Sequence, residues 1–273
     1  MNNSSPLLSL ENLSVEFSSK EQNFQAVKKL NLKIYPGEFV ALVGESGSGK
    51  TITSLSIMNL LPENARINGG TINFSGKNKS IIFQEPMTSL NPLIKIGKQI
   101  EESGLCHGMT KPQAHSQAEK LAALTGLENT RRIFNCYPHE LSGGMRQRVM
   151  IASALMTNPE LLIADEPTTA LDVSTQNKIL SIFQSLKREF NTSLLLITHD
   201  FTVVKKLCTK IYIMYKGQIV EEGQTKEVLE NPQHPYTKAL IDSIPDAKKR
   251  LKNLPGFLDK LASGNFYGEW QNE

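Results

Sequence analysis

The sequence has few of the features that mark several common protein classes. Its 273 residues include three cysteines, Cys106, Cys136 and Cys208. This odd number at wide spacing gives neither a disulfide framework nor a CxxC metal site, and it is typical of a reducing compartment. No apolar run approaches the roughly 18–20 residues that cross a bilayer. Residues 1–6 carry neither part of a secretion signal, so we expect a cytosolic protein unless a partner holds it at a membrane.

Charge of one sign is also missing. The 30 basic and 27 acidic side chains leave a net charge of +3, which is too balanced for a protein that binds the bare phosphate backbone of nucleic acid. The basic run at 248–252 is interpreted as a solvated face. With 39% hydrophobic and 21% charged residues, collagen-like, coiled-coil and disordered classes are excluded, and one large domain or two small ones are allowed.

Three short apolar runs predict a sheet buried on both faces. They are Phe39–Val43, Leu161–Ala164 and Leu194–Ile197, and runs of this kind are typical of parallel strands covered by helices. Between the last two, apolar residues at helical spacing predict an amphipathic helix: Ile179, Ile182, Phe183, Leu186 and Phe190. Strand, helix, strand in this order is a βαβ crossover, so an α/β core is expected.

The flanking segments have other patterns. Residues 7–35 predict short antiparallel strands, and about 98–135 predict an inserted helical lobe. Residues 211–220 predict a hairpin around the dipeptide Lys216-Gly217. From Pro232 a short helix is expected to lead into a tail.

Residues 44–51, GESGSGKT, match the pattern G-x-x-x-x-G-K-[ST]. Glycines let backbone N–H groups turn inward to form an anion nest, and the helix that begins near Lys50 points its positive end at the same place. Lys50 would neutralise β- and γ-phosphate charge, and the Thr51 hydroxyl would bind Mg²⁺. A purely structural glycine-rich turn is disfavoured because the motif lies between a buried strand and a helix. The predicted nucleotide-binding residues are Gly44, Glu45, Ser46, Gly47, Ser48, Gly49, Lys50 and Thr51.

Acidic and imidazole groups end the other two apolar runs. Asp165 would hold Mg²⁺ through water, and Glu166 is placed to polarise an attacking water. His199 ends the third run, where the carboxyl edge of a parallel sheet makes it a candidate γ-phosphate contact. A solvent-facing acid pair and a structural histidine are the alternatives. No Asn-Lys-x-Asp motif occurs, which disfavours a GTPase.

A second glycine-rich helix start, Ser142-Gly143-Gly144, precedes Asp165 and predicts a second anion site. One chain has little use for two such sites on one nucleotide, but two facing chains could each close the other's ATP. With this set of motifs the chain resembles the ATP-binding subunits of ABC transporters over nearly all of its length.

The resemblance implies one nucleotide-binding domain over residues 1–273. Its fold would be a RecA-like P-loop NTPase core with a parallel sheet, an N-terminal antiparallel β subdomain, and an α-helical subdomain at about 86–158. Residues 44–51 resemble the Walker A loop, and Leu161–Glu166 the Walker B strand with Glu166 as catalytic carboxylate. Gln84 matches the Q-loop glutamine, which senses Mg²⁺ and the attacking water and links to the permease.

The remaining family positions carry over in the same way. Ser142, Gly143 and Gly144 match the signature motif that caps the partner's γ-phosphate. The segment 169–172, which ends at Asp172, resembles the D-loop, and His199 resembles the switch histidine. Phe17 stands where the family has an aromatic residue that stacks on adenine, although a plain hydrophobic role fits it nearly as well. The resemblance thus implies Glu166, His199 and Gln84 as catalytic residues, and Thr51, Gln84 and Asp165 as Mg²⁺ ligands.

Residues 84–92 and 231–240 are similar to the dipeptide and oligopeptide importers, a group that also contains nickel and opine importers. We therefore predict an ATP-hydrolysing subunit that energises peptide import from the cytoplasmic face of the cell membrane. Nickel or opine import, and a soluble ABC ATPase without a transport role, are the alternatives.

The resemblance also implies partners. These are permease subunits, a second ATPase subunit that is identical or related, and, indirectly, an extracytoplasmic solute-binding protein; no nucleic acid is expected. Two features depart from the group. Only residues 77–83 separate Gly76 from Gln84, where relatives carry a longer arm. The C-terminal extension, about 230–273, lacks a cysteine cluster, so no iron–sulfur cluster is expected.

Overall fold

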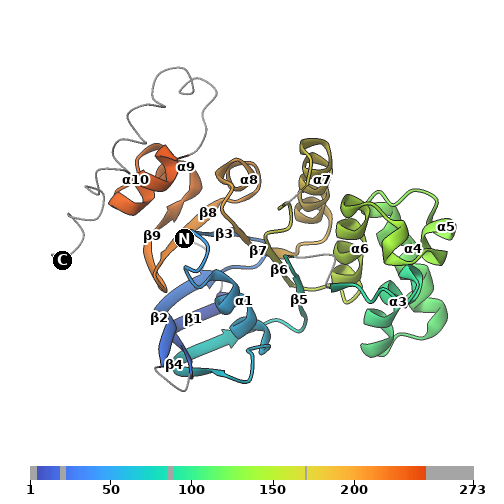
Figure 1. Ribbon diagram of the computed structural model, residues 1–273, viewed down its shortest axis with the longest axis horizontal. Coiled ribbons are helices and arrows are strands. Elements are labelled where there is room, and N and C mark those ends of the chain that lie inside the picture. The colour runs from blue at the N-terminus through green and yellow to red at the C-terminus, as the bar shows by residue number, and fades with distance from the viewer. Residues whose placement is uncertain (1–4, 19–22, 85–88, 170, 244–273) are drawn as a thin grey trace.

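Two β-sheets and a separate group of helices make up the structure, a computed structural model that describes residues 5–18, 23–84, 89–169 and 171–243 (Figure 1). The smaller sheet is antiparallel, with strand order β2-β1-β4. Its strands are β1 (Leu8–Phe17), β2 (Phe24–Ile34) and β4 (Ala65–Phe74). The antiparallel strands predicted within 7–35 are therefore present, but with ten and eleven residues they are long rather than short.

The larger sheet has the strand order β5-β6-β7-β3-β8-β9. Its members are β5 (Lys79–Ile82), β6 (Leu161–Asp165), β7 (Ser193–Thr198), β3 (Phe39–Val43), β8 (Lys210–Tyr215) and β9 (Gln218–Gln224). The first five are parallel and β9 is antiparallel to β8. Every residue of β3, β6 and β7 is buried, as the three apolar runs predict for strands covered on both faces.

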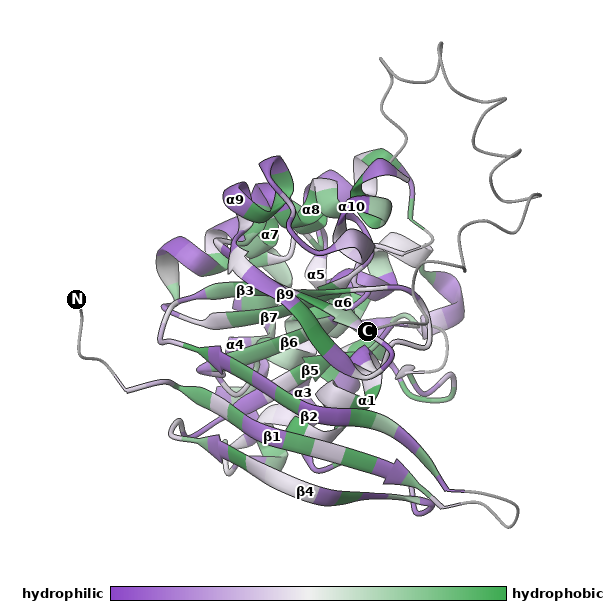
Figure 2. Ribbon diagram, turned by 90° about the vertical axis from the view of Figure 1, so that its left-hand side faces the viewer, coloured by the Kyte–Doolittle hydropathy of each residue, from purple (hydrophilic) through white to green (hydrophobic). Residues whose placement is uncertain are grey.

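Two hydrophobic clusters cover the opposite faces of the larger sheet. Along β3, Val40 and Leu42 pack with the apolar residues of the antiparallel sheet. Ala41 and Val43 point the other way and pack with the helices, because successive strand residues face opposite sides. Figure 2 shows the resulting layers, with the antiparallel sheet on one side and α7 to α10 on the other.

The helices fall into two groups. Helices α3 (Ile96–Cys106), α4 (Lys111–Leu124), α5 (Thr130–Asn135) and α6 (Gly143–Leu155) form a lobe inserted between β5 and β6, apart from the antiparallel sheet (Figure 1). The others are α1 (Lys50–Met58), α7 (Val173–Glu189), α8 (Phe201–Leu207), α9 (Thr225–Glu230) and α10 (Pro235–Asp242), with a 3₁₀ turn at Pro138–Glu140. Among the described residues, no helix is long and apolar enough to cross a bilayer.

Two local predictions have different outcomes. The hairpin is confirmed: Lys216 and Gly217 join β8 to β9 with φ of 45° and 87°, the left-handed pair that suits the twist of a two-residue turn. The apolar stripe is wrong at its last member. Phe190 follows the end of α7 as its C-cap and is 41% exposed, so the buried stripe ends at Leu186.

Candidate functional site

The predicted site residues gather at one edge of the larger sheet. Gln84 follows β5, Asp165 ends β6, His199 follows β7, and loop 44–49 follows β3. These four strands are neighbours and parallel, so their carboxyl ends meet at the same edge. A cavity of about 760 Å³ opens there. It is lined by Phe17, Phe24, Ala26, Glu45, Ser46, Gly47, Gly49, Lys50, Thr51, Ile52, Gln84, Asp165, Glu166 and His199.

The glycine-rich loop fits its surroundings only because two of its positions lack a side chain. A Cβ on Gly44 would lie 2.2 Å from the carbonyl oxygen of Met214 in β8. Gly49 caps the start of α1 with φ of 106°, and a Cβ there would lie 2.6 Å from the carbonyl oxygen of Ala26. The loop is thus seated directly on β8 and β2, with its backbone facing the cavity.

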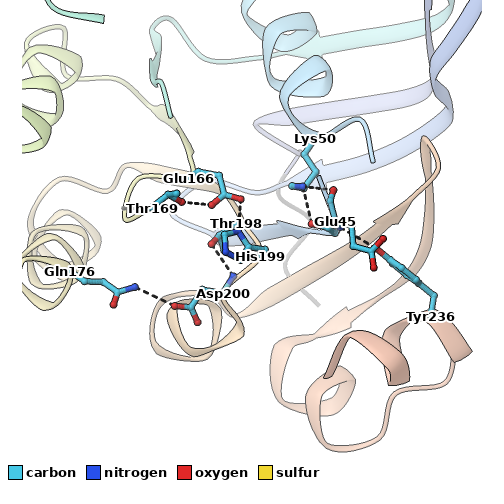
Figure 3. A network of polar contacts seen from close by, with 10 residues as sticks. Glu45, Lys50, Glu166, Thr169, Gln176, Thr198, His199, Asp200 and Tyr236 are labelled. Atoms are coloured by element: carbon cyan, nitrogen blue, oxygen red, sulfur yellow. Dashed lines mark hydrogen bonds and ion pairs between the residues drawn. The ribbon is translucent and has the colours of Figure 1, made fainter. Parts of the chain in front are cut away.

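Lys50 is the first residue of α1, and its side chain crosses the loop. Its ammonium Nζ donates hydrogen bonds to the carbonyl oxygens of Gly44 at 2.8 Å and Glu45 at 2.9 Å (Figure 3). Burial lowers the pKa of this ammonium, while the nearby carboxylates of Glu166 and Asp165 act in the opposite direction. A cation is therefore held between the loop and the acid pair, where an anionic ligand would meet it.

Asp165 is an almost fully buried carboxylate at the end of β6, with 2% of its surface exposed. Burial raises its pKa, and a hydrogen bond from the Thr51 hydroxyl works against that rise. Its Oδ1 atom has no hydrogen-bond partner in the described part of the chain. A buried carboxylate oxygen without a partner, next to a hydroxyl, is the oxygen donor set that Mg²⁺ prefers.

Glu166 is held in place from both sides of its carboxylate. Oε1 lies 2.8 Å from Nδ1 of His199, and Oε2 accepts a 2.5 Å hydrogen bond from the hydroxyl of Thr169 (Figure 3). The backbone of Glu166 has φ of 50°, and its N–H donates to the carbonyl of Ile197 on β7. This left-handed turn, uncommon for a residue with a side chain, aims the carboxylate along the sheet edge toward His199.

Asp200 fixes the backbone directly after His199. Its carboxylate caps α8 by accepting N–H bonds from Thr202 and Val203, and its own N–H donates to the Thr198 hydroxyl. Gln176 of α7 adds a 3.2 Å hydrogen bond to the same carboxylate. Hydrogen bonds therefore fix both residues next to His199, Thr198 and Asp200, and so restrict the position of the imidazole.

Two aromatic rings stand at the outer part of the cavity. Phe17 at the end of β1 pairs with Phe24 at the start of β2, and both line the cavity. Phe24 is 62% exposed, so the face of its ring is open to a ligand at this end of the cavity. Phe24 is absent from the predicted site, although the hairpin register of 7–35 could have indicated it as the cross-strand partner of Phe17.

The signature segment lies elsewhere. Ser142 is exposed and caps α6, accepting the N–H of Met145. Asp172 caps α7 through Thr175, whose hydrogen bonds lower the pKa of that carboxylate. A Cβ on Gly144 would lie 2.3 Å from Thr175. The N-termini of α6 and α7 are therefore in close contact. None of Ser142, Gly143, Gly144 and Asp172 lines the cavity of the same chain.

A glycine-rich loop between a buried parallel strand and a helix, with an acid pair ending a strand of the same sheet, defines a P-loop nucleotide-binding protein. The family model described as "ABC transporter" matches residues 27–169, more than half of the sequence, and the chain belongs to this family. The expected α/β fold and the ABC-type ATPase class are thereby confirmed. A second model, "Oligopeptide/dipeptide transporter, C-terminal region", matches residues 220–264, of which the structure describes those up to 243.

The names of similar proteins are consistent with membership of this family. The oligopeptide transport ATP-binding protein AppD of Bacillus subtilis (strain 168) is 47% identical, over 94% of this chain and 82% of that protein. OppD of Escherichia coli (strain K12), described in the same words, is 43% identical over 92% and 80%. Among solved structures, the dimeric cassette MJ0796 bound to ADP and Pi is 29% identical with a TM-score of 0.71, covering 80% of this chain and 98% of that one.

Proposed function

We propose that the chain is the ATP-hydrolysing subunit of an ABC importer for peptides. The observation that carries the proposal is the cavity in which Lys50, Asp165, Glu166 and His199 converge with Gln84 at one sheet edge. The peptide assignment is supported by the match to the oligopeptide/dipeptide transporter C-terminal region and by relatives named as oligopeptide transport proteins.

The loop and Lys50 bind the triphosphate. Backbone N–H groups of residues 46–49 and the N-terminus of α1 supply fixed positive partial charge. Lys50 then exchanges its two carbonyl contacts for the more strongly charged phosphate oxygens. Phe17 and Phe24 flank the open end of the cavity, where flat apolar surfaces suit the adenine ring.

Magnesium fits the oxygen donors beside the loop. Thr51, Asp165 and Gln84 would hold it, directly or through water, and the partnerless Oδ1 of Asp165 is the observation that favours this set. When bound, the ion neutralises phosphate charge and polarises the γ-phosphoryl group. The raised pKa of Asp165 follows from burial, so a nearby cation would favour its ionised form.

Glu166 is the proposed general base. Its carboxylate takes a proton from the water that attacks the γ-phosphorus, while the bond to the β-phosphate oxygen breaks. His199, hydrogen-bonded to Glu166, and Gln84 position the water and the γ-phosphoryl group. The Thr169 hydroxyl holds the second carboxylate oxygen, so the base is already oriented before the substrate enters.

The signature segment is proposed to serve a second ATPase subunit, identical or related. Because Ser142, Gly143, Gly144 and Asp172 lie outside their own cavity, their exposed helix start is available to the nucleotide of a facing chain. ATP binds the closed pair better than the open one and so drives closure, and hydrolysis removes that difference. The pair would work on permease subunits at the cytoplasmic face of the membrane, with a solute-binding protein on the other side.

Loss of the gene in its source cell is expected to abolish uptake of a radiolabelled tripeptide and to leave ⁶³Ni²⁺ uptake unchanged. A plasmid that encodes the wild-type chain should restore peptide uptake, and one that encodes Glu166→Gln should not. Both proteins should be recovered in the membrane fraction at equal amounts. Loss of nickel uptake with normal peptide uptake would contradict the peptide assignment.

Phe17→Ala is expected to weaken ATP binding about tenfold or more, because stacking on one base contributes roughly 1–3 kcal/mol. Binding of inorganic tripolyphosphate, which has no base, should stay at the wild-type level in the same titration. Phe190→Ala, an exposed ring at the end of α7, is the matched control for loss of an aromatic side chain. Equal weakening of both ligands by Phe17→Ala would show that the ring supports the loop and does not contact adenine.

A further inference from the structure

The C-terminal helix α10 contacts the phosphate-binding loop through one hydroxyl group. Tyr236 is buried, with 7% of its surface exposed. Its Oη atom accepts the backbone N–H of Glu45 at 3.1 Å, across 191 residues of sequence (Figure 3). Glu45 faces the cavity, whereas Tyr236 is not among the residues that line it. The hydroxyl therefore supports the loop from behind.

Tyr236 is itself held on the larger sheet. Its ring packs against Tyr215 at the end of β8, with centroids 4.2 Å apart. At the start of α10, Nδ1 of His234 accepts the N–H of Tyr236, and the carboxylate of Glu221 on β9 accepts the N–H groups of Gln233 and His234. The hydroxyl is therefore held by β8, which adjoins β3 where the loop emerges, and by β9 on the far side of β8.

The turn between β8 and β9 makes a second contact with the loop. The N–H of Gly217 donates to the carbonyl of Ser48 at 3.0 Å, and the carbonyl of Gly217 accepts the N–H of Lys28 on β2. Two loop residues, Glu45 and Ser48, are thus fixed by chain segments more than 160 residues further along the sequence. Such long-range ties select one loop conformation from the several that glycine-rich segments can adopt.

We propose that Tyr236 is a positioning residue for nucleotide binding, acting through the N–H of Glu45. The inference rests on the nucleotide site proposed above. Glu45 is an exposed residue and its N–H bond to Tyr236 is partly buried, so without this acceptor the N–H turns to water and no longer holds the loop in one shape. The fraction of molecules with a binding-competent loop then falls, and the apparent affinity falls with it.

The contact does not depend on ordinary changes of pH. Burial raises the pKa of Tyr236 to about 12, so the phenol keeps its proton throughout the range in which the protein is handled. A protonated phenol has oxygen lone pairs to accept the N–H. Removal of the hydroxyl, and not pH, is therefore the way to test the contact.

Tyr236→Phe is expected to raise the KM for ATP about three- to tenfold and to change kcat by less than about twofold, because a hydrogen bond to a neutral group has a modest net effect. Tyr215→Phe is the matched control. It keeps the same ring contact, and the Tyr215 hydroxyl makes no hydrogen bond within the described part of the chain. Full-length proteins of equal thermal stability are compared by calorimetric ATP titration and by steady-state hydrolysis.

Hydrogen exchange of the nucleotide-free protein tests the contact without ATP. The Glu45 amide should exchange faster in Tyr236→Phe than in wild type or Tyr215→Phe. Wild-type ATP affinity in Tyr236→Phe, unchanged exchange at Glu45, or an equal loss of affinity in Tyr215→Phe would each overturn the proposal. Failure of the underlying site is a separate result: Lys50→Ala would then bind ATP as well as wild type.

Discussion

Glu166→Gln is expected to bind ATP with wild-type affinity and to hydrolyse it at least about 100-fold more slowly, the usual contribution of a general base. Glutamine has the shape of glutamate but cannot take up the proton of the attacking water. It retains an oxygen for the Thr169 hydroxyl, and it can still face His199. Because the bound ATP is hydrolysed so slowly, a nucleotide-bound dimer should accumulate.

Phosphate release and gel filtration in the presence of Mg²⁺ and ATP measure the two effects. Glu63→Gln, the same substitution at an exposed turn residue, should behave as wild type in both. Hydrolysis by Glu166→Gln at the wild-type rate would remove Glu166 from the role of base. A slow variant that stays monomeric with ATP would instead contradict the shared-nucleotide arrangement proposed for Ser142.

Lys50→Ala is expected to weaken ATP binding more than about 100-fold, since a lysine in a dry site makes strong charge-assisted bonds to phosphate. Folding should survive. Burial lowers the pKa of Lys50, which means that the charged ammonium destabilises the folded state at any pH below the pKa of Lys50 in the folded protein. Replacing Lys50 by alanine removes this unfavourable contribution to the free energy of folding. Thermal unfolding of Lys50→Ala should therefore give the wild-type melting temperature, whereas ATP titration should show that binding is lost.

Lys226→Ala is the control for Lys50→Ala, because Lys226 is an exposed lysine on α9 outside the cavity. It should leave both measurements unchanged. Retained ATP affinity in Lys50→Ala would exclude loop 44–51 as the triphosphate site. A large drop in melting temperature would show instead that the two carbonyl contacts of Lys50 hold the loop together.

Local patterns in the sequence predict the sheet core well. Phe39–Val43, Leu161–Asp165 and Ser193–Thr198 are strands with every residue buried, because an uninterrupted apolar run has one stable place in an α/β protein. Strand β4 is missing from the predictions for an equally physical reason. All of its residues are partly or fully exposed and it lies at an edge. Gly69 and Gly70 interrupt the alternation of Ile67, Ile72 and Phe74 with polar residues, so the strand pattern is weak.

The site residues also fall into those that local sequence motifs predict and those that they do not. Loop 44–51 and the pair Asp165-Glu166 are short contiguous motifs, and the parallel order of the strands brings them together. Gln176 and Phe24 lie in no motif, and Tyr236 lies in the segment 231–240, whose resemblance to peptide importers assigns it no role. The place of Phe24 depends on the register of β1 and β2, and the places of Gln176 and Tyr236 depend on packing between distant segments, which no local pattern specifies.

The position of β8 sets a limit on how far the chain can be shortened. A fragment cut just after His199 would contain every residue of the predicted ATP site, yet it would lose the strand that pairs with the outer side of β3. Phe39–Val43, wholly apolar, would then present unpaired backbone groups at a free sheet margin, the kind of surface that recruits other chains into aggregates. Such a fragment should precipitate, and the smallest soluble version of this protein therefore extends beyond the last residue of its ATP site to include β8.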